Sequence, residues 1–182
     1  KIKYMFPKAH AAAYVMAAVR LGWYKLYRPK EFYCVFLTVR GEDFDAESAV
    51  SGLSAVRQKI KALQAKGMDR TAKEDAQLMN LQIIGECLGR GIEFLPVDIY
   101  KSHATQYLVE DGKIRLPFNA LKGLGDTAAK ALYKATQEGG PYTSADEIVT
   151  RSGVGQSIVD MLRAVGALGD MPATSQMTLF GF

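Results

Sequence analysis

Apolar residues recur at helical spacing through the first half of the chain. The pattern predicts helices over four segments, namely residues 8–25, 31–38, 54–63 and 72–88. Pro7 favours the start of the first helix, and Thr71 with Glu74 forms a capping box before the last one. Segment 31–38 is so rich in aromatic residues that a strand fits it equally well. The first half is therefore predicted to be mainly helical.

The pattern changes in the middle of the chain. Residues 92–97 are typical of a strand, and the turn Glu110-Asp111-Gly112 between two short apolar stretches indicates a β-hairpin. From Asn119 the spacing becomes helical again, and from Asp170 the chain is polar. We predict a mostly α protein with four parts: a helical part (1–95), a β-rich connector (96–118), a second helical part (119–170) and a flexible C-terminal tail (171–182).

The run from Leu121 to Ala129 has the most informative chemistry. Gly123 and Gly125 let the backbone turn tightly and approach a partner, because glycine has no Cβ. A helix starting near Asp126 points its first amides outward as a cradle for an anion. This is the pattern of a helix-hairpin-helix unit, which holds a DNA phosphate without recognising base sequence. The predicted DNA contacts are Lys122, Gly123, Leu124, Gly125, Asp126, Thr127 and Lys130.

A weaker copy of the same outline follows around Gly153 and Gly155, which we also count as candidate DNA contacts. Ser144-Ala145-Asp146-Glu147 predicts a capping box at the start of its first helix. Val159 replaces the small residue that permits close helix packing in the first copy. We therefore expect a tandem helix-hairpin-helix domain whose second copy mainly supports the first.

The charge distribution agrees with a polyanionic partner. The 182 residues carry a net charge of +4, and the first thirty contain seven Lys or Arg and no Asp or Glu. Cys34 and Cys87 have no partner at metal-binding spacing, which favours buried, reduced thiols. No apolar run has transmembrane length and no secretory signal is present, so we predict a cytoplasmic, nucleoid-associated protein without a membrane partner.

Two further clusters have alternative interpretations. One interpretation of the first cluster is a nucleotide site. A triphosphate would lie at the helix start beside Lys8 and His10, and Tyr14, one turn later, would lie beside the base or sugar. Spacing alone favours the alternative that these are ordinary core or rim residues. Asp43 and Asp45 fit a two-metal site, but the helix start that follows favours Asp45 as an N-cap.

The C-terminal end carries a candidate docking peptide. Gln176 places an amide ahead of the apolar residues Met177, Leu179 and Phe180 in an otherwise polar segment. Such a segment can fold into a pocket of a partner protein and lose chain entropy only on binding.

Together these motifs give a resemblance to a known family. Residues 6–14, residues 33–44, the glycine hairpin and residues 176–180 resemble the C-terminal part of the bacterial replicative DNA polymerase III alpha subunit, most closely its PolC type. The resemblance covers essentially the whole chain. It implies that residues 1–95 belong to the fingers, with Lys8, His10 and Tyr14 facing the incoming deoxynucleoside triphosphate. It also implies that residues 119–170 bind primer-template duplex, and that Gln176, Met177, Leu179 and Phe180 bind the sliding clamp. Such tails usually have leucine where this chain has Met177.

The resemblance implies a DNA-directed DNA polymerase, a nucleotidyltransferase, of which this chain is one piece. In that family the catalytic aspartates bind Mg2+ in a palm domain that would precede Lys1, and nothing in this chain matches them. We therefore expect no catalytic residue and no metal ligand here, and no polymerisation without the remaining domains. The rival hypothesis is a stand-alone, non-enzymatic DNA-binding adaptor recruited by the clamp. A third is an interaction module whose basic patches are only solvated.

Overall fold

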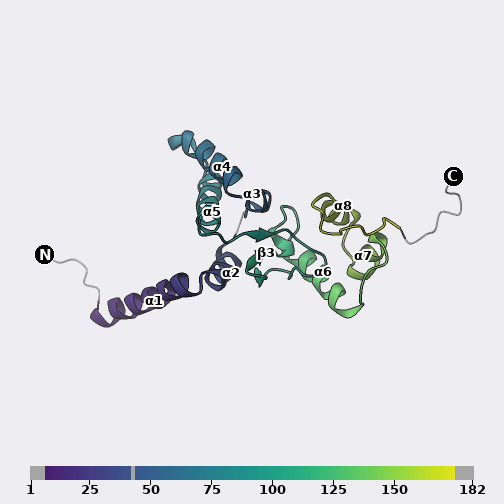
Figure 1. Cartoon of the computed structure of the whole chain (residues 1–182), viewed down its shortest axis with the longest axis horizontal. Helices are drawn as coiled ribbons and strands as arrows, with labels where there is room; N and C mark the ends of the chain where they lie inside the picture. Colours follow the sequence, from purple (N-terminus) through teal and green to yellow (C-terminus); the bar gives the residue numbers. More distant parts are fainter. Residues whose placement is uncertain (1–6, 42–43, 175–182) are drawn as a thin grey trace.

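The computed structural model describes residues 7–41 and 44–174. Its helices are α1 (Lys8–Tyr27), α2 (Pro29–Arg40), α3 (Ala46–Ser51), α4 (Leu53–Ala65), α5 (Ala72–Gly89), α6 (Asp126–Glu138), α7 (Ala145–Ser152) and α8 (Gln156–Ala164). Its strands are β1 (Phe94–Leu95), β2 (Leu108–Glu110) and β3 (Lys113–Arg115), and short 3-10 turns cover Gly67–Asp69 and Phe118–Ala120. In Figure 1, α1 extends as an arm from one end, α4 and α5 form a projecting pair, and α6 to α8 lie beyond the small sheet. The mostly helical prediction is confirmed.

Local signals set the boundaries of the first helices. Pro7 precedes α1, and Pro29 is the first residue of α2. The segment that fitted a helix or a strand is helical, because α2 turns Tyr33, Cys34 and Leu37 toward the core. Both cysteines are buried and free, as predicted. Burial raises the pKa of each thiol to about 12, so both stay protonated at neutral pH.

Both predicted helix caps in this half are present. The Asp45 Oδ1 atom accepts a hydrogen bond from the Ser48 amide at 3.0 Å, and its Oδ2 atom accepts one from Lys59 Nζ at 2.8 Å. Thr71 and Glu74 form the reciprocal capping box of α5. The Asp45 carboxylate is thus occupied as a cap, while Asp43 lies outside the described residues.

The sheet has the order β1-β3-β2, with β1 parallel and β2 antiparallel to β3. Asp111 and Gly112 both have positive φ, which is the geometry of a tight hairpin turn and confirms that prediction. Of the predicted strand 92–97, only Phe94–Leu95 pairs, and it does so with β3.

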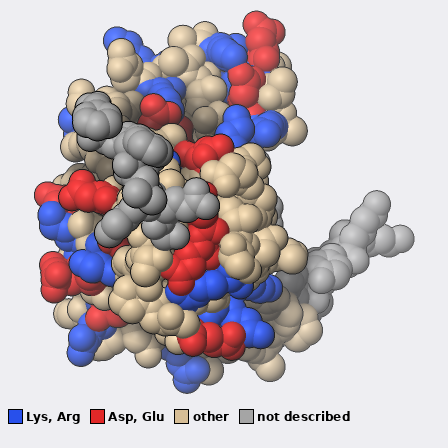
Figure 2. Space-filling view, turned by 90° about the vertical axis from the view of Figure 1, so that its right-hand side faces the viewer, with Lys and Arg blue, Asp and Glu red and all other residues tan. Residues whose placement is uncertain are grey.

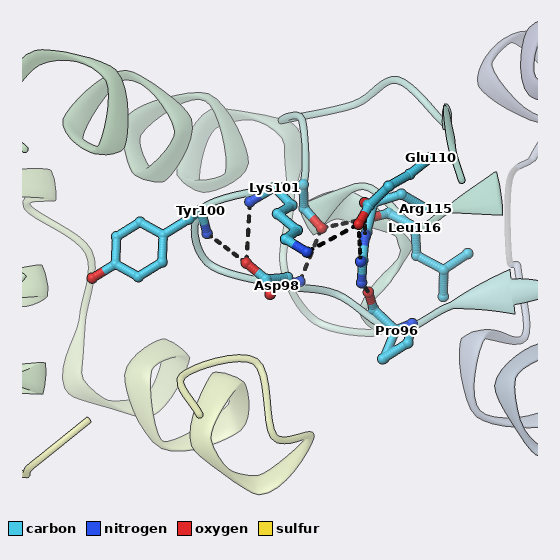
Figure 3. A network of polar contacts seen from close by, with 8 residues as sticks. Pro96, Asp98, Tyr100, Lys101, Glu110, Arg115 and Leu116 are labelled. Atoms are coloured by element: carbon cyan, nitrogen blue, oxygen red, sulfur yellow. Dashed lines mark hydrogen bonds and ion pairs between the residues drawn. The ribbon is translucent and has the colours of Figure 1, made fainter. Parts of the chain in front are cut away.

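A partly buried ion pair ties the three strands together (Figure 3). Arg115 donates to both carboxylate oxygens of Glu110 at 2.7 Å and to the Pro96 carbonyl at 2.6 Å, just after β1. The guanidinium lowers the pKa of Glu110 to about 2. A second donor, Lys101 Nζ, reaches the same carboxylate at 3.1 Å. Because the charged groups satisfy one another, Arg115 can lie against the continuous apolar core that joins the two helical parts, whereas Leu108 and Val109 of β2 are exposed.

Two local expectations were wrong. The element before Gly123 is a single 3-10 turn and not a helix, because Pro117 and Leu121 on either side have extended backbones and leave room for one turn. The second capping box does not form on Ser144, whose side chain is buried. Instead the amide and hydroxyl of Thr143 donate to Glu147 Oε2 at 2.7 and 2.8 Å. In addition, none of the described helices is long and apolar enough to span a membrane.

His103 gives the connector a pH dependence. Its Nδ1 atom accepts hydrogen bonds from the amides of Thr105 and Gln106, and its ring contacts Tyr133 of α6 at a centroid distance of 4.4 Å. Burial lowers the pKa of His103. The folded state therefore favours neutral His103, so this contribution to stability is present above about pH 6.5 and is lost as the pH falls through the lowered value.

We predict that the Tm of the chain falls more steeply from pH 7 to pH 5 than the Tm of His103→Asn, which keeps an acceptor that does not titrate. Each kcal/mol lost corresponds to about 2–4 °C in a chain of this size. Parallel Tm curves for the two proteins, measured by circular dichroism, would contradict this role of His103.

Candidate nucleic-acid interface

The first glycine hairpin places free helix amides at the surface. Gly123 has a φ of +95°, and Gly125 is the N-cap of α6. Between them Leu124 is only 3% exposed, and its amide donates to the Leu121 carbonyl at 3.0 Å. The first intrahelical bond of α6 runs from the Ala129 amide to the Gly125 carbonyl. The three amides before it therefore have no acceptor within the helix, and no side chain caps them.

Most of the predicted DNA contacts lie exposed around these amides: Lys122, Gly123, Gly125, Asp126, Thr127 and Lys130. The Leu124 side chain is the exception, since its burial leaves only the backbone available to a ligand. The carboxylate of Asp126 accepts a hydrogen bond from Asn119 Nδ2 at 3.0 Å, which draws it toward the preceding turn. Two exposed lysines, one just before the glycines and one in the second turn of α6, thus flank the three amides in sequence.

The second hairpin repeats this geometry thirty residues later. Gly153 has a φ of +70°, Gly155 is the N-cap of α8, and Val154 between them is buried. Val159 is also buried, at the position that Ala129 holds in the first copy. The tandem prediction is therefore confirmed as geometry.

The two copies differ in charge. Ser152 stands where the first copy has Lys122, and Asp160 where it has Lys130. Asp160 is exposed and accepts a hydrogen bond from Gln156 Nε2 at 3.0 Å. A phosphate at the second hairpin would meet a carboxylate in place of an ammonium group. Although Asp126 stands where the second copy has Gln156, the two lysines make the first hairpin the candidate with the more positive charge.

One arginine, which sequence reasoning missed, links the two copies. Arg151 donates to the Ala135 carbonyl at 2.6 Å and to the Gly140 carbonyl at 3.1 Å. Its guanidinium carbon lies 4.1 Å from the centre of the Tyr142 ring. These contacts hold α6, the following loop and α7 together, and no spacing in the sequence signals them.

The two glycines of the first hairpin, Gly123 and Gly125, differ in what the backbone requires of them. Gly123 needs its positive φ, and an added Cβ would lie 3.3 Å from Met161 Cε. Gly125 has an ordinary φ of −75°, and an added Cβ would meet no atom within 4 Å. Neither backbone strain nor packing within the described residues therefore explains glycine at position 125.

The first hairpin also borders a cleft of about 1420 Å³. Lys122 and the two glycines line one side, and Val39 of α2 and Val50 of α3 are among the residues that line the rest. Figure 2 shows Lys, Arg, Asp and Glu interspersed over the face it presents, without a continuous basic field on the described part of it.

The proposed nucleotide residues lie on the arm and away from the hairpins (Figure 1). Lys8, His10 and Tyr14 are all exposed, and the Tyr14 ring packs edge-on against His10 at a centroid distance of 4.5 Å. Tyr14 is 66% exposed, so within the described residues it belongs to the surface and not to the core. The clamp residues Gln176, Met177, Leu179 and Phe180 lie outside the described residues.

Comparison with known proteins identifies the relatives of the chain. A family model described as a helix-hairpin-helix motif matches residues 91–177. The DNA polymerase III PolC-type of Clostridium perfringens is 42% identical over 181 residues, and those of Bacillus cereus and Thermotoga petrophila are 41% and 39% identical. The chain is homologous to a segment of DNA polymerase III PolC-type proteins. The matches cover 99–100% of the chain but only 12–13% of the relatives.

The hairpin geometry predicts opposite stability effects for two neighbouring substitutions. Gly123→Ala should destabilise the chain by about 1–2 kcal/mol, because alanine is strained at positive φ. Gly125→Ala should leave stability unchanged or raise it by up to about 1 kcal/mol, because it only restricts the unfolded chain. Urea denaturation of both variants measures this, and an equal loss in the two would refute the assigned backbone roles.

Proposed function

We propose that the chain serves a replicative DNA-directed DNA polymerase by holding primer-template duplex through its first helix-hairpin-helix unit. The observation that carries the proposal is the set of uncapped α6 amides presented beside Lys122 and Lys130. Such amides donate to phosphate oxygens, and the helix dipole favours the negative charge. Contacts of this kind position a duplex without reading its sequence, as a replicative enzyme requires.

We further propose that α1 forms part of the nucleotide site of that polymerase. Lys8 lies in the first turn of α1, where its charge adds to the free amides of the helix start. The same helix exposes large apolar residues on several sides, among them Val15, Met16 and Leu21. A helix that is apolar all round is normally buried, which supports packing of α1 within a larger polymerase.

The chemical step belongs to another part of the polymerase in this proposal. Within residues 7–41 and 44–174 there is no group of three or more His, Cys, Asp or Glu side chains that could hold a metal ion. The Mg2+ that the resemblance implies therefore does not fit a site among these residues, and we assign them no catalytic step. We propose that the segment alone binds DNA in the cytoplasm but does not polymerise.

We propose that the C-terminal tail tethers the polymerase to the sliding clamp. Gln176, Met177, Leu179 and Phe180 would enter a pocket of the sliding clamp, with the glutamine amide hydrogen-bonded and the apolar side chains buried. Tethering raises the effective concentration of the polymerase at the duplex without any further DNA contact.

Gly125→Val tests the phosphate cradle. An added Cβ meets no atom within 4 Å among the described residues, and in this proposal the side chain would occupy the space of an approaching strand. We expect the affinity for a short duplex, measured by fluorescence anisotropy, to fall about tenfold, which corresponds to ~1.4 kcal/mol. Unchanged affinity of the folded variant would exclude the cradle.

The matched control is Gly155→Val in the second hairpin, for which we expect a smaller loss because Asp160 already disfavours phosphate there. Lys122→Gln should also make the slope of log K against log salt about 0.9 less negative, because each phosphate contact contributes that amount. An equal loss at the two hairpins would contradict the dominance of the first.

Deleting residues 176–180 tests the tether. Binding to the sliding clamp, measured by surface plasmon resonance, should be abolished, because the deleted segment holds all the proposed anchors. Duplex affinity should stay the same, since the hairpins are intact. Retained clamp binding would refute the tail assignment.

A further inference from the structure

Helix α1, the arm in Figure 1, buries none of its side chains against the rest of the described chain. None of its residues from Lys8 to Tyr27 is buried. Its side-chain contacts with α5 gather in the last turn, at Lys25. Among the described residues, the direction of α1 therefore depends on this end, where it also meets α2.

At that end, side chains from three helices meet in a closed network. Lys25 Nζ of α1 lies 2.8 Å from Glu86 Oε1 of α5. Arg90, directly after α5, donates to the Tyr33 hydroxyl of α2 at 3.0 Å and to the Lys25 carbonyl at 3.1 Å. The Lys25 carbonyl lies in the last turn of α1, where carbonyls have no amide donor within the helix, so a cation there also complements the helix dipole.

The centre of the network is buried. The Tyr33 side chain is fully inaccessible, and burial raises its pKa to about 12, so the hydroxyl keeps its proton. The same hydroxyl hydrogen-bonds Glu86. Burial alone would raise the pKa of Glu86, but the hydrogen bonds from Lys25 and Tyr33 lower it. Each polar group of this network therefore bonds a partner that is charged or buried. An isolated surface ion pair, in contrast, has a single contact between two exposed side chains.

Helix α1 is long enough that a small rotation at its last turn would displace Lys8 at its other end. Lys8 is separated from Lys25 by about 26 Å along the helix axis, at ~1.5 Å per residue. A swing of about 10° at the joint would move Lys8 by about 4–5 Å over that length. Such a shift exceeds the length of a hydrogen bond to a phosphate oxygen.

We propose that Lys25, Tyr33, Glu86 and Arg90 form a joint that fixes the direction of α1 and thereby the position of Lys8, His10 and Tyr14. These four are positioning residues, since they act on the nucleotide only through α1. The consequence for nucleotide binding rests on the proposed function of α1, whereas the joint itself does not.

The first experiment measures the direction of α1 in the whole chain. Spin labels at Ala9→Cys in α1 and Met68→Cys, beside the tip of the α4–α5 pair, report the distance between the two by pulsed electron resonance. Both positions are exposed, whereas the native Cys34 and Cys87 thiols are buried. Glu86→Gln removes the charge that holds Lys25, and Tyr33→Phe removes the hydroxyl while keeping the buried ring.

We expect each variant to widen the distance distribution about twofold, because the joint no longer selects one direction. The matched control is Glu138→Gln, which removes the carboxylate of the Lys134–Glu138 pair on α6, and its distribution should match that of the unmodified chain. Circular dichroism checks that each variant is folded. A folded Tyr33→Phe or Glu86→Gln with an unchanged distribution would overturn the joint.

The second experiment uses the full polymerase that contains this segment and measures single-nucleotide incorporation. Glu86→Gln should raise the KM for the deoxynucleoside triphosphate at least about threefold and leave duplex affinity unchanged, as expected when binding geometry alone is lost. A widened distribution with an unchanged KM would keep the joint but remove the nucleotide role of α1. An unchanged distribution refutes the joint whatever the KM.

Discussion

The burial of Leu124 between two exposed glycines is the constraint on which the candidate interface depends. Its side chain is fixed in the core, so the backbone on either side must turn outward. Gly123 makes that turn possible through its positive φ, and Gly125 then opens α6 with uncapped amides. Val154 repeats the arrangement in the second copy. Phosphate binding is thus proposed to follow from a packing requirement, with the two lysines adding charge to it.

The small sheet explains how one chain holds two distant sites in a defined relation. Arg115 and Glu110 are paired inside it, and the Pro96 carbonyl brings the first strand into the same network. Removing the Glu110 carboxylate would leave the Arg115 guanidinium, whose side chain is 7% exposed, without its charged partner. The core continues from α2 through the sheet to α8. The arm and the hairpins therefore lie at opposite ends of one packed body (Figure 1).

Features that depend on local sequence could be predicted, and features that depend on distant partners could not. The Asp45 cap, the Thr71 capping box and the Asp111-Gly112 turn each involve residues within four positions, and all three are present. Arg151 and the joint around Tyr33 connect residues far apart in the chain, and nothing at those positions marks them in advance. The Ser144 capping box failed for the same reason, because tertiary packing buries that side chain and leaves its neighbour to bond Glu147.

Amide proton and nitrogen chemical shifts, followed while duplex DNA is added to the chain, test the central claim most directly. The account predicts that the largest early shifts belong to residues 123–128, with smaller ones at the second hairpin, whatever the base sequence of the duplex. Shifts concentrated elsewhere, with residues 123–128 unchanged at saturation, would contradict it.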